Sequence, residues 1–128
     1  MSYYQVTEWL SGAYRITSPE FVFIELIVGE EKALLFDTGW GTGNLRETVC
    51  GITDKSLIIV NSHGHVDHVN GNYQFEEVIF IHPNDIELCK AHSGTQMRQF
   101  VLTSVEGMGI LPDGFDKDGY LSGGKHKL

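Results

Sequence analysis

Residues 61–72 read NSHGHVDHVNGN, and this stretch decides how the whole chain is interpreted. Three of the six histidines of the chain lie in it, at His63, His65 and His68, and Asp67 stands beside the last of them. Chance would place such an H-x-H-x-D-H pattern in about one chain in a thousand of this composition. Imidazole and carboxylate groups hold zinc, iron or manganese in proteins. The stretch therefore predicts a metal site, and the alternative of a solvated loop with exposed histidines is the less favoured interpretation.

The spacing of the four ligand-type residues suits two ions. After a strand, a turn can direct residues i and i+2 at one ion while residues i+4 and i+5 face a neighbouring ion. Two ions about 3.5–4 Å apart can hold a bridging hydroxide as nucleophile and polarise the bond under attack. The pattern therefore predicts a two-metal catalytic centre.

Short apolar runs surround this stretch. They predict strands over 3–9, 13–16, 21–28, 32–36, 57–60 and 78–81. The first three should be antiparallel. A helix over 45–52 separates the runs 32–36 and 57–60, so these two should be parallel strands of a β-α-β unit. The expected fold class is α/β.

Two further helices are expected in the second half of the chain. One follows Pro83, with Asn84 as its cap and Glu87 at the capping-box position. The other runs from about Thr95 to Val105. Its apolar spacing predicts a buried face made of Met97, Phe100, Val101 and Val105.

Polar residues follow three of the predicted strands at the point where each ends. The triplet Asp37-Thr38-Gly39 follows the run 32–36, the histidine-rich stretch follows 57–60, and His82 follows 78–81. In open α/β sheets, ligands bind beyond the carboxyl ends of the parallel strands. The strand map therefore predicts the same site as the histidine pattern.

The pattern His63-x-His65-x-Asp67-His68, with Gly71 three residues on, resembles the signature of the metallo-β-lactamase superfamily. The upstream run LLFDTG at 34–39 resembles the first motif of that family. The resemblance covers essentially the whole chain. It implies an αββα sandwich of which residues 1–128 are the amino-terminal part of a single domain, the first half only.

The resemblance also implies a role for each site residue. His63 and His65 would bind the first metal, Asp67 and His68 the second, with Asp67 also the candidate catalytic residue. Asp37 would lie beside the metal loop and orient it without binding an ion. The implied cofactor is a pair of zinc ions in the complete domain, with iron or manganese as alternatives.

The family's second half brings a third histidine, a bridging aspartate and a final histidine, and none of these is found here. The closing stretch Asp118 to Leu128 resembles the segment before the family's next histidine motif, so the chain is expected to be truncated. Each half-site then has two ligands, whereas catalytic zinc normally has three. The chain alone is expected to be metal-poor and inactive, and to self-associate through the face that the missing half would cover.

The leading functional hypothesis is a hydrolase whose two-metal-bound hydroxide cleaves an ester, thioester, lactone, amide or phosphodiester bond of a small-molecule substrate. A second hypothesis is a non-catalytic half-domain. A third is the di-metal oxidoreductase branch of the same fold. That branch usually has glutamate where this chain has His65, which favours hydrolysis.

The composition limits which classes of partner are expected. The formal charge of −8 and the scattered basic residues make nucleic acid a poor partner. No stretch resembles a signal peptide or a membrane span, so a cytoplasmic protein is expected. Cys50 and Cys89 are interpreted as buried apolar residues rather than a redox pair.

The remaining candidates receive ordinary structural interpretations. His82 is expected to be hydrogen-bonded scaffolding, although it follows a strand near the site. His92 and His126 lack partners in the sequence and are interpreted as surface residues. Trp40 could line a substrate pocket or serve equally well in packing. The glycines 39, 41 and 43 predict a tight turn rather than a phosphate loop.

Overall fold

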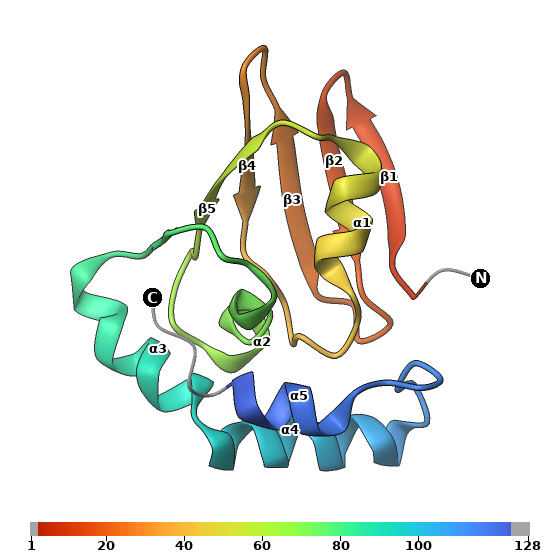
Figure 1. Ribbon diagram of the computed structural model, residues 1–128, viewed down its shortest axis with the longest axis vertical. Helices are drawn as coiled ribbons and strands as arrows, with labels where there is room; N and C mark the ends of the chain where they lie inside the picture. Colours follow the sequence, from red (N-terminus) through yellow and green to blue (C-terminus); the bar gives the residue numbers. More distant parts are fainter. Residues whose placement is uncertain (1–2, 124–128) are drawn as a thin grey trace.

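The computed structural model describes residues 3–123 as one mixed sheet with helices on one face and at one end (Figure 1). The strands are β1 (Gln5–Leu10), β2 (Ala13–Thr17), β3 (Phe23–Val28), β4 (Lys32–Phe36), β5 (Ser56–Val60) and β6 (Ile79–Phe80). The α-helices are α1 (Leu45–Ile52), α2 (Val66–Val69), α3 (Ile86–Ser93), α4 (Thr95–Met108) and α5 (Lys117–Ser122), and two short 3-10 helices span Asn72–Gln74 and Pro83–Asp85.

The strands lie in the sheet in the order in which they occur in the chain, β1-β2-β3-β4-β5-β6. The first three pairings are antiparallel, and β4, β5 and β6 are parallel to one another. The β4-α1-β5 unit confirms the parallel crossover expected from the sequence. The carboxyl ends of β4, β5 and β6 therefore meet at one edge of the sheet.

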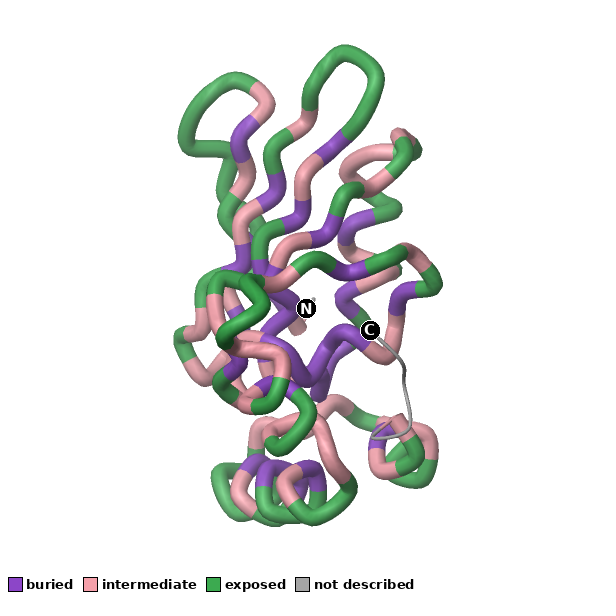
Figure 2. The backbone as a smooth tube through the Cα atoms, turned by 90° about the vertical axis from the view of Figure 1, so that its left-hand side faces the viewer, coloured by how far each residue is buried: buried purple, intermediate pink, exposed green. Residues whose placement is uncertain are grey.

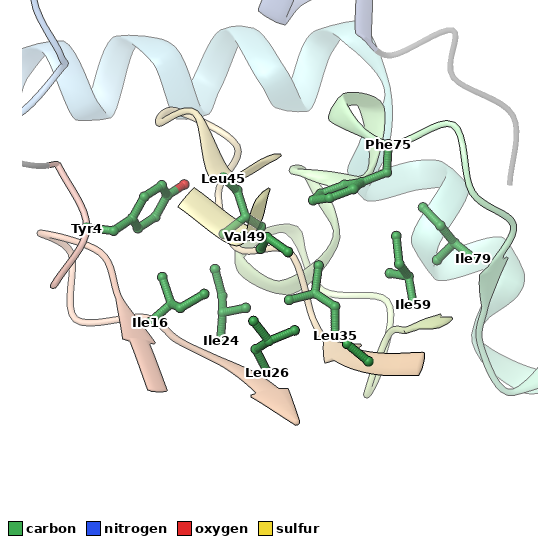
Figure 3. Packing of buried hydrophobic residues seen from close by; sticks show 11 residues of the cluster. Tyr4, Ile16, Ile24, Leu26, Leu35, Leu45, Val49, Ile59, Phe75 and Ile79 are labelled. Carbon is green, nitrogen blue, oxygen red and sulfur yellow. The ribbon is translucent and has the colours of Figure 1, made fainter. Parts of the chain in front are cut away.

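Alternate side chains of the strands point to opposite faces of the sheet. On one face Ile24, Leu35 and Ile59 are fully buried, and α1 covers them with Leu45 and Val49 (Figure 3). Asn44 caps α1 by accepting a hydrogen bond from the Glu47 amide at 3.0 Å. This face is the core of the described chain.

The opposite face, here called the outer face, carries Phe23, Ile27, Phe36, Ile58 and Phe80. All five are exposed, and they alternate with the buried residues along the strands (Figure 2). No described helix packs over them.

Helices α4 and α5 lie beyond the carboxyl ends of β4 and β5 (Figure 1). Their contact forms a second apolar cluster of Val101, Leu102, Val105 and Tyr120, against which Trp40 packs. No helix among residues 3–123 has the length and apolar character needed to cross a membrane.

The buried face of α4 differs from the sequence expectation. Val101 and Val105 are buried as expected, but Met97 is only half-buried and Phe100 is 63% exposed. Arg98 is only 1% exposed and lies on the buried face, where the apolar pattern had placed Met97. Apolar spacing could not predict the burial of Arg98, because its guanidinium is satisfied by backbone carbonyls from other segments.

Two other expectations were wrong. Asn84 does not cap α3, because the chain makes a 3-10 turn over Pro83–Asp85, and the helix begins after Asp85. Cys50 is exposed rather than buried, since it lies on the side of α1 away from the sheet, whereas Cys89 is buried as expected. His126 lies outside the described residues.

Candidate metal centre

The four candidate ligands lie on one segment, residues 61–69, here called the histidine loop. It leaves the carboxyl end of β5 and turns into α2, whose N-cap is His65. The ring centroids of His63 and His65 are 4.8 Å apart, and those of His63 and His68 are 4.2 Å apart. The Asp67 Oδ2 atom lies 3.6 Å from His68 Nε2. The structure thus brings all four residues together beyond the end of β5.

Asp37 lies directly behind this loop. Its Oδ1 accepts a hydrogen bond from the Ser62 amide at 2.7 Å, and its Oδ2 lies 2.7 Å from the Ser62 hydroxyl and 2.8 Å from His68 Nδ1. The side chain is buried, and the backbone φ of Asp37 is +71°, a left-handed conformation that costs a non-glycine residue energy. The hydrogen bond that His68 donates to the Asp37 carboxylate raises the pKa of His68. Strain at a residue with three such bonds points to a positioning function.

The hydrogen bonds define which ring nitrogens remain available. A carboxylate only accepts, so His68 Nδ1 must carry a proton toward Asp37. The Ser62 hydroxyl gives its one proton to Asp37, so His63 Nδ1, 2.8 Å from that oxygen, must donate to it. In their neutral form, both rings therefore keep their lone pair on Nε2. An outer partner on one ring nitrogen with the other left free is the usual arrangement of metal-binding histidines, so these residues fit a metal.

The described donors do not form a closed coordination shell. Among residues 3–123, no group of three or more His, Cys, Asp or Glu side chains is arranged so that it could hold an ion. The donor chemistry and the tautomers fit a metal, whereas the complete ligand set is not assembled within this part of the chain.

The turn after β4 packs closely against the end of the histidine loop. Thr38 donates its amide to the His68 carbonyl at 3.0 Å and its hydroxyl to Asn72 Oδ1 at 2.7 Å. Asn72 exchanges amide hydrogen bonds with Asn61 at 2.8 and 3.2 Å. A Cβ added to Gly71 would lie 2.1 Å from the Thr38 carbonyl oxygen, so only glycine fits there. The two sequence motifs, residues 34–39 and 63–71, are therefore in direct contact in the structure.

Comparison with known proteins identifies the family of this chain. The sequence profile of the Metallo-beta-lactamase superfamily matches residues 18–83, a span that contains Asp37 and the whole histidine loop. The chain belongs to the metallo-beta-lactamase superfamily. A search of curated proteins gave no significant match.

Solved structures of metallo-beta-lactamases share the fold. The enzyme from Erythrobacter litoralis, crystallised with beta-mercaptoethanol in its active site, matches with a TM-score of 0.59 at 20% identity, over 72% of this chain and 47% of that one. FIM-1 from Pseudomonas aeruginosa, in its mono-zinc form, matches with a TM-score of 0.57 at 15% identity, over 70% and 46%. TMB-1 matches with a TM-score of 0.55 at 17% identity, over 71% and 48%. The chain spans about half the length of these structures and matches about half of the metallo-beta-lactamase fold.

Two residues of this superfamily member contact the histidine loop although the sequence interpretation assigned neither of them to the site. Asp85 Oδ2 accepts a hydrogen bond from the Gly64 amide at 3.0 Å, and His92 Nδ1 accepts one from the Val66 amide at 3.0 Å. His92, interpreted as a surface residue, is instead half-buried and holds a backbone amide of the loop. Asp85 and His92 lie seven residues apart, about two helical turns, but that spacing alone does not indicate which loop they meet.

The other candidates keep structural roles in this metallo-beta-lactamase fold. His82 is exposed, and its Nδ1 accepts a hydrogen bond from the Asn84 amide at 3.1 Å. Trp40 packs against α4 and α5, and its carbonyl accepts the Tyr120 hydroxyl at 3.2 Å. Gly39 and Gly41 have φ of +73° and +81°, which agrees with a tight turn.

Proposed function

We propose that this chain carries half of the metal centre of a hydrolase that cleaves an ester, thioester, lactone, amide or phosphodiester bond in a small molecule. The observation that supports it best is the hydrogen-bond network from Asp37 through Ser62 to His63 and directly to His68. This network leaves Nε2 of both rings free to bind a cation. The superfamily match over the same residues supports the assignment.

In this proposal His63 and His65 bind one ion, and Asp67 and His68 bind its neighbour. Zinc is the first choice, because imidazole and carboxylate suit it and FIM-1 was crystallised with one zinc, while iron or manganese would accept the same ligands. A bound pair of ions would lower the pKa of a water and polarise the bond under attack. The Asp67 side chain is 38% exposed, so its carboxylate is accessible to an arriving substrate.

Zinc titration of the purified chain tests the ligand assignment. With two donors per ion, binding should be weak, so the titration is carried into the millimolar range. The imidazole resonances of His63, His65 and His68 should shift together as zinc is added. Alanine variants at each of the three should lose most of this response, while His82→Ala, an exposed histidine outside the loop, should respond like the wild type. Unchanged zinc binding in His65→Ala and His68→Ala would refute the proposal.

A non-catalytic half-domain is the second candidate. Two observations favour it: within residues 3–123 no three donors converge, and the chain spans about half the length of the structures it matches. A panel of ester, lactone and phosphodiester substrates with saturating zinc separates the two functions. Zinc-dependent turnover that disappears in His68→Ala supports the hydrolase, whereas zinc binding without turnover supports the half-domain.

A further inference from the structure

Helix α3 presents one row of residues to the histidine loop. Asp85 directly precedes the helix, and Cys89 and His92 follow at spacings of four and three, so the three lie on the same side. Asp85 Oδ2 and His92 Nδ1 each accept a backbone amide of the loop at 3.0 Å. Cys89 lies between them and is fully buried.

The two amides that α3 binds belong to Gly64 and Val66, the residues that alternate with His63, His65 and Asp67. A Cβ on Gly64 would lie 2.6 Å from the Cys89 backbone nitrogen and 2.9 Å from the Asp85 carbonyl oxygen. The loop backbone therefore lies directly on the helix backbone. Each bonded amide also fixes the chain between two candidate ligands.

We propose that Asp85 and His92 are positioning residues that hold the backbone of the histidine loop against α3, so that its ligands are oriented before a metal arrives. The inference rests on the proposed function. Ordering a free loop costs conformational entropy, and a loop that is already held does not incur this cost when the ion binds. The two hydrogen bonds thus raise metal affinity without touching the ion.

His92 acts through a defined atom. Nδ1 accepts the Val66 amide, so this nitrogen has no proton, and the neutral ring carries its proton on Nε2. The His92 ring also lies beside that of His65, with centroids 5.5 Å apart and a 37° angle between the planes. The Oδ1 atom of an asparagine occupies nearly the same place as Nδ1, whereas leucine fills the space without an acceptor. The pair His92→Asn and His92→Leu therefore isolates the hydrogen bond from the packing.

Asp85 allows a similar comparison. Asp85→Asn retains an oxygen that can accept the Gly64 amide, and Asp85→Ala removes it. Glu87→Ala is the matched control, because Glu87 lies on the same helix with its side chain 88% exposed.

The experiment measures amide hydrogen exchange in the metal-free chain and zinc affinity by titration. Asp85→Ala should speed exchange mainly at Gly64, and His92→Leu mainly at Val66, with the rest of α3 unchanged. Both should weaken zinc binding about 10- to 100-fold, the usual effect of losing an outer hydrogen bond at a metal site. Both asparagine variants should recover most of the affinity, and Glu87→Ala should match the wild type.

Wild-type zinc affinity in Asp85→Ala and His92→Leu would overturn the inference, as would asparagine variants as weak as the alanine and leucine ones. The His65→Ala and His68→Ala titrations keep this failure separate from that of the proposed function. If those variants lose zinc and the α3 variants do not, only the inference fails. If the wild-type chain itself does not respond to zinc, both fail.

Discussion

At the scale of single residues, Asp37 combines two costs, a buried carboxyl group and a left-handed backbone. Asp37→Ala and Asp37→Gly both remove the hydrogen bonds to Ser62 and His68, so both should weaken zinc binding at least tenfold. Glycine accepts a φ of +71° without strain, so Asp37→Gly should be more stable than Asp37→Ala by about 1 kcal/mol. Urea denaturation and zinc titration of both variants measure the two effects separately.

Zinc binding of the glycine variant decides whether Asp37 has a positioning function. If Asp37→Gly bound zinc as the wild type does, the Asp37 carboxylate would have no positioning function.

The two cysteines give a second test at this scale. Cys50 is exposed, while Cys89 is buried, and burial raises the pKa of its thiol. The thiolate is the reactive form, so iodoacetamide at neutral pH should modify Cys50 and leave Cys89 unmodified until the chain unfolds. Mass spectrometry should show one adduct in buffer and two in denaturant. Rapid modification of Cys89 in the folded chain would contradict the contact between α3 and the histidine loop.

At the scale of elements, Arg98 joins α4 to its neighbours. Its guanidinium donates to the carbonyls of Ser93, Tyr120 and Asn70 at 3.0, 3.2 and 3.1 Å, and its charge lies 4.8 and 4.9 Å from the ring centroids of Tyr73 and Tyr120. The Asn70 carbonyl directly follows the histidine loop. One side chain thus connects this loop to α5 and to the junction of α3 and α4.

Replacing Arg98 should therefore be costly. Arg98→Met leaves three carbonyls without their donor and should lower the free energy of unfolding by about 2–4 kcal/mol. Arg98→Lys keeps the charge but not the planar guanidinium. Its free energy of unfolding should lie between those of the wild type and Arg98→Met. Phe100→Ser, on the exposed side of the same helix, should change stability by less than about 0.5 kcal/mol. If Phe100→Ser were the more damaging change, the orientation of α4 would be wrong.

At the scale of the whole molecule, the outer face is a continuous apolar surface across β3 to β6. Arg15 and Glu25 form an ion pair at 2.7 Å at its β2–β3 side, so the charges beside the apolar surface are already neutralised. A second copy related by a two-fold axis would cover the apolar residues with its own sheet. We therefore expect the chain to form a dimer through the outer face.

Sedimentation over a range of concentrations measures this association. Wild-type chain should be dimeric at tens of micromolar, and the double variant Phe36→Ser/Ile58→Glu should be monomeric with the same secondary structure. Phe100→Ser removes an exposed aromatic residue from another surface and should leave the dimer intact. A monomeric wild-type chain, or a dimer in the double variant, would contradict the expectation.

Local patterns were sufficient to predict most elements. The strand over 32–36 matches the structure, and a helix is present where Leu45, Val49 and Ile52 recur at helical spacing. Both were predictable because the residues that define them are near neighbours in the chain. The placement of Asp37 beside His68 also followed from the sequence, since each comes after one of two adjacent parallel strands. The roles of His63, His65, Asp67 and His68 as ligands stay predictions.

The sequence by itself thus determined the α/β class, the parallel crossover and the loop on which the candidate ligands stand, because periodicity and motif spacing are properties of short stretches. Only the tertiary structure decided that Arg98 rather than Phe100 is buried, that Cys50 faces solvent, and that Asp85 and His92 hold the loop amides. Each of these features depends on which segments pack against one another in the folded chain. A buried polar side chain is stable only where acceptors and donors from distant segments satisfy it, and the spacing of residues along the chain carries no record of those partners.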